Sequence, residues 1–576
     1  MHSKKKVSGV ITVFISLMLV CVLSLGTLAL EAGRFQAAKT QLAEANISAS
    51  SSMIAAYDAK LYDRYGLLAI DNEVSTLGRS KNYLEFNSDL TAGYRGNNLT
   101  RMYSINSVEM QGMYNLTYPG VLKRQILTRA KYNINPNDFS FNYYNMDLFL
   151  SDLQMRSQFV AQKLAPVANG SADLGLLSDI NPQMLSAITA LYSTFSTVEK
   201  FDSDCDVNLS SSSVALLPSF TGTVESNVPD EDIQDINNAV LDAKTVLGSS
   251  ASIFEYTTPT APDVNVTTSV NFVSNLTGTI NDVKSITNMH ATSKDVASKC
   301  VTMAQGINAA INMLQSDREG NLLLNSYIAH YFSNRNNTVD GYMGPAKGTT
   351  IDGTDANATF SGACVEYVFG GSSSEKTNQQ IAYDYVTAIR LINNLYITLN
   401  NSTSINYNNA YSVMGHIAWA YYETCVDVEL LANYNAVVPL YKYNMILPVN
   451  NPGAVASAFG SKNIANAMSS LGIYNGTSFV VGGSDQTTYK DSLALALWML
   501  PNSDKLLRVA DLIQLEMRYR EAHAENKTAT FLMSEQNTFC RVKVTAKMNA
   551  ILPVITTGSN SGVNGTTFQS IKYAGY

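Results

Sequence analysis

Charged residues, histidine, tryptophan and cysteine are all scarce in this chain of 576 residues. Only 15% of the residues are charged, and there are five histidines, two tryptophans and six cysteines. The apolar share is 46%, which is not typical of a disordered chain or of a protein that crosses a membrane many times. The net charge of −8 argues against nucleic acid as a partner.

Metal-binding motifs are missing as well. The histidines are scattered, and none has the paired spacing of a zinc site. Asp202, Asp204 and Asp206 alternate as at the start of a calcium loop. However, Val207 stands where that loop needs glycine, and Ser213 stands where it needs glutamate. We expect a solvated loop, with a weak calcium site as the alternative, and we predict no cofactor.

Cysteine usage gives no dense disulfide framework. Cys21 lies in an apolar segment, which leaves an odd number of cysteines at irregular spacings. One bridge and buried thiols are both open, the latter most naturally at positions 425 and 540. The remaining cysteines are Cys205, Cys300, Cys364, Cys425 and Cys540.

One pair of carboxylates is a candidate for chemistry. Glu423 and Asp427 stand four residues apart on one face of an expected helix. Such a pair could do acid–base work. The alternative, which we favour, is that one of them pairs with a cation such as Arg390 between packed helices. No nucleophile, base and orienting residue can be nominated together, so we expect that the protein is not an enzyme.

A single long uncharged segment is present. Residues 7–30 follow Lys4, Lys5 and Lys6 and carry no charge; as a helix they would measure roughly 36 Å, against a hydrocarbon core of about 30 Å. A cleaved signal peptide is the alternative, but its apolar region is only about 7–15 residues long. Because the basic cluster comes first, we predict a single-pass protein of the cell membrane, with residues 1–6 cytoplasmic and the bulk extracytoplasmic.

The helix is expected to continue past the membrane as a stalk over residues 31–66. No glycine occurs between Gly33 and Gly66, and Gly66 would end the helix. A stripe of mostly small residues recurs at steps of three and four. It favours close approach of another element, either the chain's own domain or a neighbouring copy. The stripe consists of Phe35, Ala38, Leu42, Ala45, Ala49, Ser52 and Ala56.

The remainder predicts a helix-dominated α+β fold with antiparallel strands near its start and end. We divide it into a mixed region (67–228), a mainly helical region (229–365), a helical region (366–524) and C-terminal strands (525–576). Residues 540–548 alternate between apolar and polar, as in a half-buried strand. This strand is expected to pair with strands from the 67–141 region. Buried helices are expected from Thr377, where Gln380 completes a capping box, and over 411–431 and 489–520.

Several short motifs resemble the TadE/TadG-like pseudopilin-type proteins of the tight-adherence (Flp) pilus system, closest to a clostridial single-span family of unknown function. The N-terminal motifs are Gly9-Val-Ile-Thr-Val-Phe-Ile-Ser-Leu, Glu31-Ala-Gly-Arg34 and Tyr65-Gly66-Leu67-Leu68. Downstream motifs are Val365-Glu366-Tyr367-Val368, Pro439-Leu440-Tyr441-Lys442 and Arg508-x-x-Asp511. Phe14 stands five residues after Gly9, where prepilins carry glutamate, so cleavage at Gly9 is left open.

The resemblance implies a membrane-anchored structural or assembly component of such a pilus or of a related surface apparatus. Its N-terminal helix would contact other pilus or surface-apparatus subunits. The alternative is a membrane-anchored adhesin or ligand-binding ectodomain that is independent of pili.

Overall fold

The computed structural model consists of two compact units. The stem unit contains the described residues up to Val121 and from Leu532 onward, and the helical unit contains those between Leu122 and Phe531. The predicted boundaries follow sequence order, whereas the stem unit combines both ends of the chain. The described residues are 4–71, 103–133, 143–170, 293–313, 318–342, 349–350, 359–360, 362–371, 375–401, 483–523, 531–548, 567–576 and single positions between 413 and 442.

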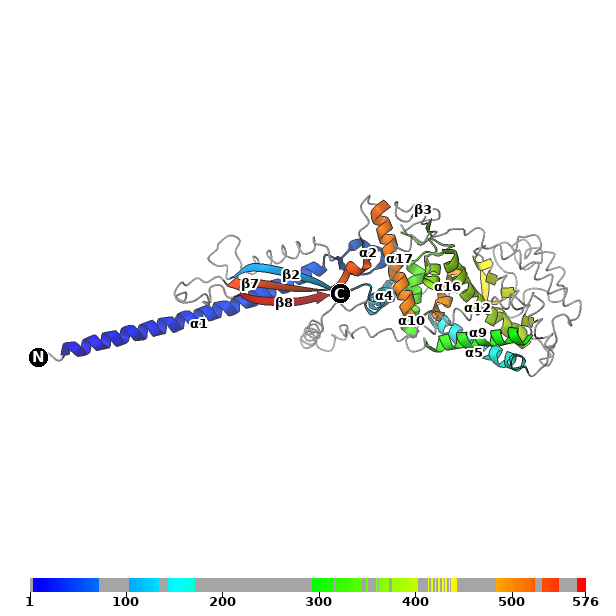
Figure 1. Cartoon of the computed structure of the whole chain (residues 1–576), viewed down its shortest axis with the longest axis horizontal. Coiled ribbons are helices and arrows are strands. Elements are labelled where there is room, and N and C mark those ends of the chain that lie inside the picture. Colours follow the sequence, from blue (N-terminus) through cyan, green and yellow to red (C-terminus); the bar gives the residue numbers. More distant parts are fainter. Residues whose placement is uncertain are drawn as a thin grey trace, which may run out of the picture. The chain divides into compact units, whose positions relative to one another are not determined.

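The stem unit begins with one long helix, α1 (Lys4–Ile54), shown in blue in Figure 1. At about 1.5 Å per residue it measures roughly 76 Å. The second half of α1 lies along three strands of the same unit (Figure 1).

The predicted continuous helix to Tyr65 is wrong, because α1 ends at Ile54 and a second helix, α2 (Ala59–Tyr65), follows. Asp58 caps α2: its carboxylate accepts hydrogen bonds from the backbone N–H groups of residues 60 and 61 at 2.9 and 3.1 Å. An N-cap residue has non-helical backbone angles, so it interrupts a preceding helix. Gly66 ends α2 in the left-handed conformation (φ +69°), as predicted.

The four-stranded sheet of the stem unit is antiparallel throughout. Strand β7 (Gln536–Met548) is central; β2 (Tyr103–Asn115) pairs with one side of it, and β8 (Thr567–Gly575) and the short β1 (Ile70–Asp71) pair with the other. The one-turn helix η9 (Met533–Glu535) leads into β7. The pairing of the C-terminal strand with the 67–141 region is therefore confirmed.

The core of the stem unit lies between α1 and one face of this sheet. Alternate residues of β7 point into it, and Val542, Val544 and Ala546 are completely buried. The facing side of α1 is lined with small residues, which allow the helix to approach the strands closely. Phe35 packs edge-on against Phe568 of β8, with ring centroids 5.5 Å apart.

Enlarging Ala45 is expected to destabilise the stem unit because the side chain is completely buried under the sheet. Overpacking of this kind typically costs about 1–3 kcal/mol. The matched control is Thr40→Leu on the exposed side of α1, expected to change stability by less than about 0.5 kcal/mol. The urea dependence of amide hydrogen exchange in β7 measures the stability of the stem unit in both variants. Equal effects of Ala45→Leu and Thr40→Leu would contradict the packing.

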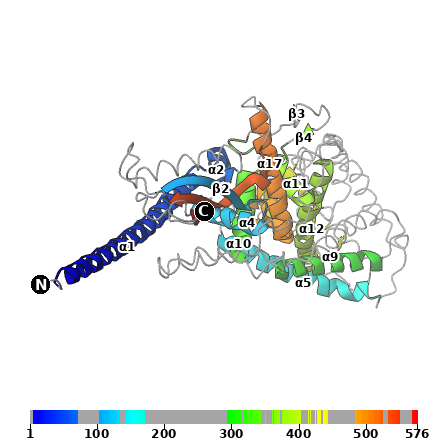
Figure 2. The same cartoon turned by 60° about the vertical axis from the view of Figure 1, so that its left-hand side comes forward.

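The helical unit is built mainly from helices. Helices α5 and α9 lie side by side in Figures 1 and 2, and α11 and α16 pack on α12. Its strands form two short antiparallel pairs, β3–β4 and β5–β6. The helices are α5 (Tyr143–Ala168), α9 (Ser293–Met313), α10 (Arg318–Tyr331), α11 (Cys364–Gly370), α12 (Glu375–Asn401), α16 (Tyr489–Ala496), η8 (Leu497–Met499) and α17 (Asn502–His523). The strands are β3 (Thr349–Thr350), β4 (Thr359–Phe360), β5 (Val438–Lys442) and β6 (Gly483–Thr487).

Three helical predictions agree with these bounds. Helix α12 buries Tyr385, Ile392 and Leu395 at the predicted spacing, α16 and α17 cover the predicted 489–520 segment, and the described positions between 413 and 432 are helical. The expected strands and loops over 67–141 are wrong in one part, since α4 (Pro119–Asn133) is a helix. Proline suits the first position of a helix, where its missing N–H is not needed.

Some predictions fall outside the described residues. They are the aspartates of the calcium-like loop, the side chains of Thr377 and Gln380, and the cysteines at 205 and 425.

Candidate functional site

The first half of α1 exposes a continuous apolar surface. The large apolar side chains between Ile11 and Leu30 are each 52–66% exposed. This segment is about 30 Å long, which matches the hydrocarbon thickness of a bilayer. Among the described residues, α1 is the one helix long and apolar enough to cross a membrane by length and composition.

Charged residues bracket this apolar surface. Helix α1 begins at the lysines of positions 4–6, and the next charged residue is Glu31. Glu31 is buried and accepts a hydrogen bond from Arg34 Nη1 at 2.9 Å, one helical turn further on. The exposed apolar segment therefore stops where the sheet-covered half of α1 begins.

The predicted stripe of small residues faces the chain's own sheet. Ala38, Leu42, Ala45 and Ala49 are completely buried there. Of the two alternatives, the stripe therefore packs on the chain's own domain. The buried row continues to Met53; Ser52 is half-buried, and Ala56 lies beyond the end of α1. The face of α1 that remains exposed beyond the apolar segment is a different one, made of Gly33, Ala37, Thr40, Glu44 and Ile47.

Asn46 fixes the position of α1 on the sheet, and sequence reasoning missed it. Its side-chain amide donates to the backbone oxygens of Val542 and Ser570 at 3.2 and 3.1 Å, one on each of two neighbouring strands. A polar residue inside an apolar stripe is the signal that could have identified it. A buried amide must find such partners, so it helps to specify the register of helix on sheet.

The two carboxylates singled out from sequence lie in a buried ionic cluster of the helical unit. Lys442, the last residue of β5, places its Nζ 2.7 Å from Glu423 Oε2 and 2.7 Å from Asp427 Oδ1. The expected cation, Arg390 of α12, donates instead to the backbone oxygen of Pro439 at 2.7 Å. Sequence reasoning did not identify Lys442 as the partner of these carboxylates, although Lys442 belongs to the Pro439-Leu440-Tyr441-Lys442 motif noted there.

Neutral side chains complete the cluster. Asn394 Nδ2 lies 3.0 Å from Thr424 Oγ1 and 3.4 Å from Asp427 Oδ2. Burial lowers the pKa of Arg390, and the nearby Asp427 carboxylate opposes that shift. With two cations and two carboxylates the cluster balances its charge, as buried charges must.

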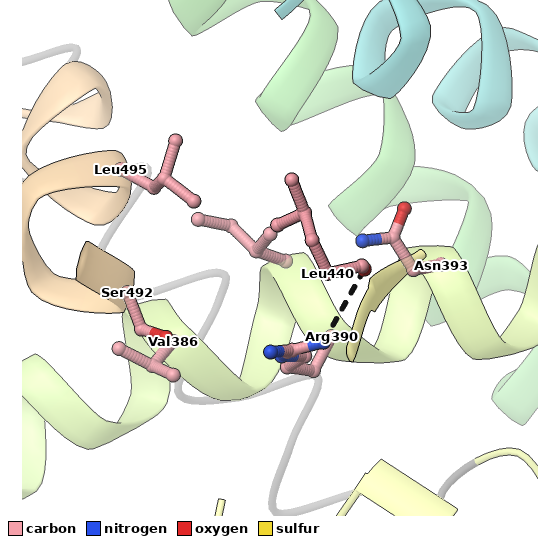
Figure 3. A pocket seen from close by; sticks show the side chains of 7 residues that line it. Val386, Arg390, Asn393, Leu440, Ser492 and Leu495 are labelled. Atoms are coloured by element: carbon pink, nitrogen blue, oxygen red, sulfur yellow. Dashed lines mark hydrogen bonds between the residues drawn. The ribbon is translucent and has the colours of Figure 1, made fainter. Parts of the chain in front are cut away.

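A small cavity lies beside Arg390, as Figure 3 shows. Its volume is about 10 Å³, which is room for a single water molecule and not for an organic substrate. The lining residues are Val386, Ile389, Arg390, Asn393, Leu440, Ser492 and Leu495. We therefore assign the ionic cluster no hydrolytic or binding role at this cavity.

A second group of buried carboxyls surrounds α11. Glu366 Oε1 accepts hydrogen bonds from the Tyr489 hydroxyl at 3.0 Å and from the backbone N–H of Arg335 at 3.1 Å, and burial raises its pKa. The Tyr367 hydroxyl donates to Asp511 Oδ2 at 2.8 Å. These contacts join α11 to α16 and α17.

Asp511 predicts a pH dependence of the helical unit. Burial raises its pKa from 3.8 to about 7, against the smaller opposing effects of the Tyr367 hydrogen bond and the Arg508 charge. The unfolded chain releases this proton near pH 4 and the folded chain only near pH 7. Because the folded-state pKa is raised, stability is lost as pH rises between those values and is level above them.

Asp511→Asn mimics the protonated carboxyl. We expect it to match the wild type near pH 4 and to be more stable at pH 8 by up to a few kcal/mol. Asp340→Asn, at an exposed position, is the control and is expected to leave the pH profile unchanged. Thermal unfolding between pH 4 and 8 measures the stability of each variant. If stability falls with rising pH as steeply in Asp511→Asn as in the wild type, the assignment to Asp511 is refuted.

The described cysteines form no disulfide. Cys21, Cys300, Cys364 and Cys540 are free thiols, and burial raises the pKa of Cys300 to about 12 and of Cys540 to about 11. Within the part of the chain that the structure describes, no group of three or more His, Cys, Asp or Glu side chains could hold a metal ion.

Comparisons with protein-family models, with curated proteins and with solved structures found no match to the chain.

Proposed function

We propose that this protein is a single-span membrane protein that serves as a structural or assembly component of a tight-adherence pilus or a related surface apparatus. The observation that supports it most is the division of α1 into two halves. One half is an exposed apolar rod of membrane length, and the other is built into the core of the stem unit. A load on the stem unit would thus be transmitted to the membrane through one unbroken helix.

The proposed topology follows from the charges at the start of α1. Lys4, Lys5 and Lys6 precede the apolar segment, and positive residues stay on the cytoplasmic side. In this arrangement the sheet of the stem unit and the helical unit both lie outside the membrane. The N-terminal motifs that resemble TadE/TadG-like proteins add the pilus context to an otherwise general anchor.

The stem offers one face for neighbouring subunits. Since the small-residue stripe is covered by the chain's own sheet, a neighbouring helix would have to use the exposed face at Ala37, Thr40 and Glu44. Ile47 on the same face is 48% exposed although apolar. We assign partner contact to this face rather than to the buried stripe.

Photocrosslinking in intact cells tests the proposal. A crosslinking residue at Thr40 is expected to capture pilus or surface-apparatus subunits, whereas the same residue at Lys547, on the opposite face of the sheet, serves as the control. Deletion of the gene is expected to reduce piliation. Normal piliation together with identical capture from both positions would instead favour the adhesin or ligand-binding alternative.

A further inference from the structure

The ionic cluster of the helical unit contains a lysine and an aspartate in a position to react. Lys442 is 6% exposed, and Glu423 and Asp427 are each 1% exposed. The Lys442 ammonium lies 2.7 Å from an oxygen of each carboxylate. Only the contact with Glu423 also has hydrogen-bond geometry; the contact with Asp427 Oδ1 is close but does not have it.

We propose that Lys442 and Asp427 condense to an intramolecular isopeptide bond, with Glu423 transferring the protons. Glu423 takes a proton from the ammonium and passes it to the Asp427 carboxyl. The neutral Nζ then attacks Cγ, the Cγ–Nζ bond forms and the Cγ–Oδ1 bond breaks. Oδ1 leaves as water with two protons, both originally on the lysine nitrogen, and Glu423 returns to its starting state.

The geometry favours this division of roles. Because a C–O bond is about 1.2 Å long and Nζ lies 2.7 Å from Oδ1, Cγ of Asp427 lies at most about 3.9 Å from Nζ, close to the roughly 3–3.5 Å of near-attack contacts. Glu423 is aligned to accept a proton from Nζ, and Asp427 is not. Asn394 Nδ2, 3.4 Å from Asp427 Oδ2, is placed to stabilise negative charge on the oxygen that stays in the amide.

Burial favours the product of the reaction. Exclusion of water protects the amide from hydrolysis. The bond would join the helical segment around Asp427 to the end of β5, which would lock two elements of the helical unit together.

Tryptic digestion of the full-length protein, solubilised in detergent and then denatured, tests the bond directly. The chain has no lysine or arginine between Arg390 and Lys442, and the next one is Lys462. Trypsin does not cut after an acylated lysine. We therefore expect one looped peptide, 391–462, lighter than its sequence by one water, while cleavage after the buried Lys505 proceeds normally.

Two results would overturn the proposal. One is recovery of separate peptides 391–442 and 443–462 with their full masses from folded protein. The other is loss of water with normal cleavage after Lys442, since this indicates a succinimide at Asp427 instead.

Two variants separate the roles. Lys442→Arg keeps the positive charge and removes the nucleophile, so no looped peptide is expected. Glu423→Gln keeps both reacting groups, and we expect the looped fraction to fall at least tenfold. A full yield of the bond in Glu423→Gln would overturn the role of Glu423. The wild-type digest decides the existence of the bond even if either variant fails to fold.

Discussion

Two arginines in the middle of the apolar half of α1, Leu19→Arg with Leu23→Arg, are expected to remove the protein from membranes. Each arginine near the centre of a spanning helix disfavours insertion by about 3 kcal/mol. Both leucines are 58–59% exposed, so the change cannot be explained by a disturbed protein core. Fractionation of cells into membrane and soluble material measures the effect.

The control places the same charges on the same helix beyond the apolar segment, as Ala37→Arg with Thr40→Arg. Both positions are exposed, and we expect full retention in the membrane fraction. If the two double variants fractionate alike, the apolar half of α1 is not what holds the protein at the membrane.

Replacing Arg390 by leucine is expected to destabilise the helical unit by about 3–5 kcal/mol. Arg390 is 4% exposed, supplies one of the two positive charges in the ionic cluster and donates to the backbone oxygens of β5. Its loss leaves an uncompensated negative charge in a buried site, and breaking a buried ionic group in this way carries a penalty of that size.

Arg518→Leu is the matched control, because Arg518 is an interior residue of helix α17 with a partly exposed side chain. It is expected to change stability by less than about 0.5 kcal/mol. Urea unfolding followed by hydrogen exchange in α12 compares the two. A loss of similar size in both variants would show that the cluster does not depend on its charge balance.

The features that the sequence predicts well depend on regular patterns. Absence of charge defines the apolar half of α1, and strict alternation over residues 540–548 identifies β7 together with its buried face. The left-handed conformation of Gly66 follows from a residue type that alone adopts it at no cost. In each case a local rule and the tertiary structure agree.

The features that it misses depend on single residues or on the packing of separate elements. The break after Ile54 is accompanied by the cap at Asp58, whose signal in the sequence is a single residue. Lys442 meets Glu423 because strand β5 packs against the helical segment that carries Glu423, 19 residues earlier in the chain. Periodicity identifies buried positions, but it does not state which buried charges face one another.

The most direct test of the account is the side of the membrane on which each end of the apolar half of α1 lies. Ser51→Cys, at an exposed position of the stem, and Ser3→Cys, before the lysines, can be treated with a membrane-impermeant maleimide in intact cells. We predict labelling of Ser51→Cys above the parent protein, and labelling of Ser3→Cys only after permeabilisation. Labelling of Ser3→Cys in intact cells, or protection of Ser51→Cys, would contradict a stem unit held outside the cell by α1.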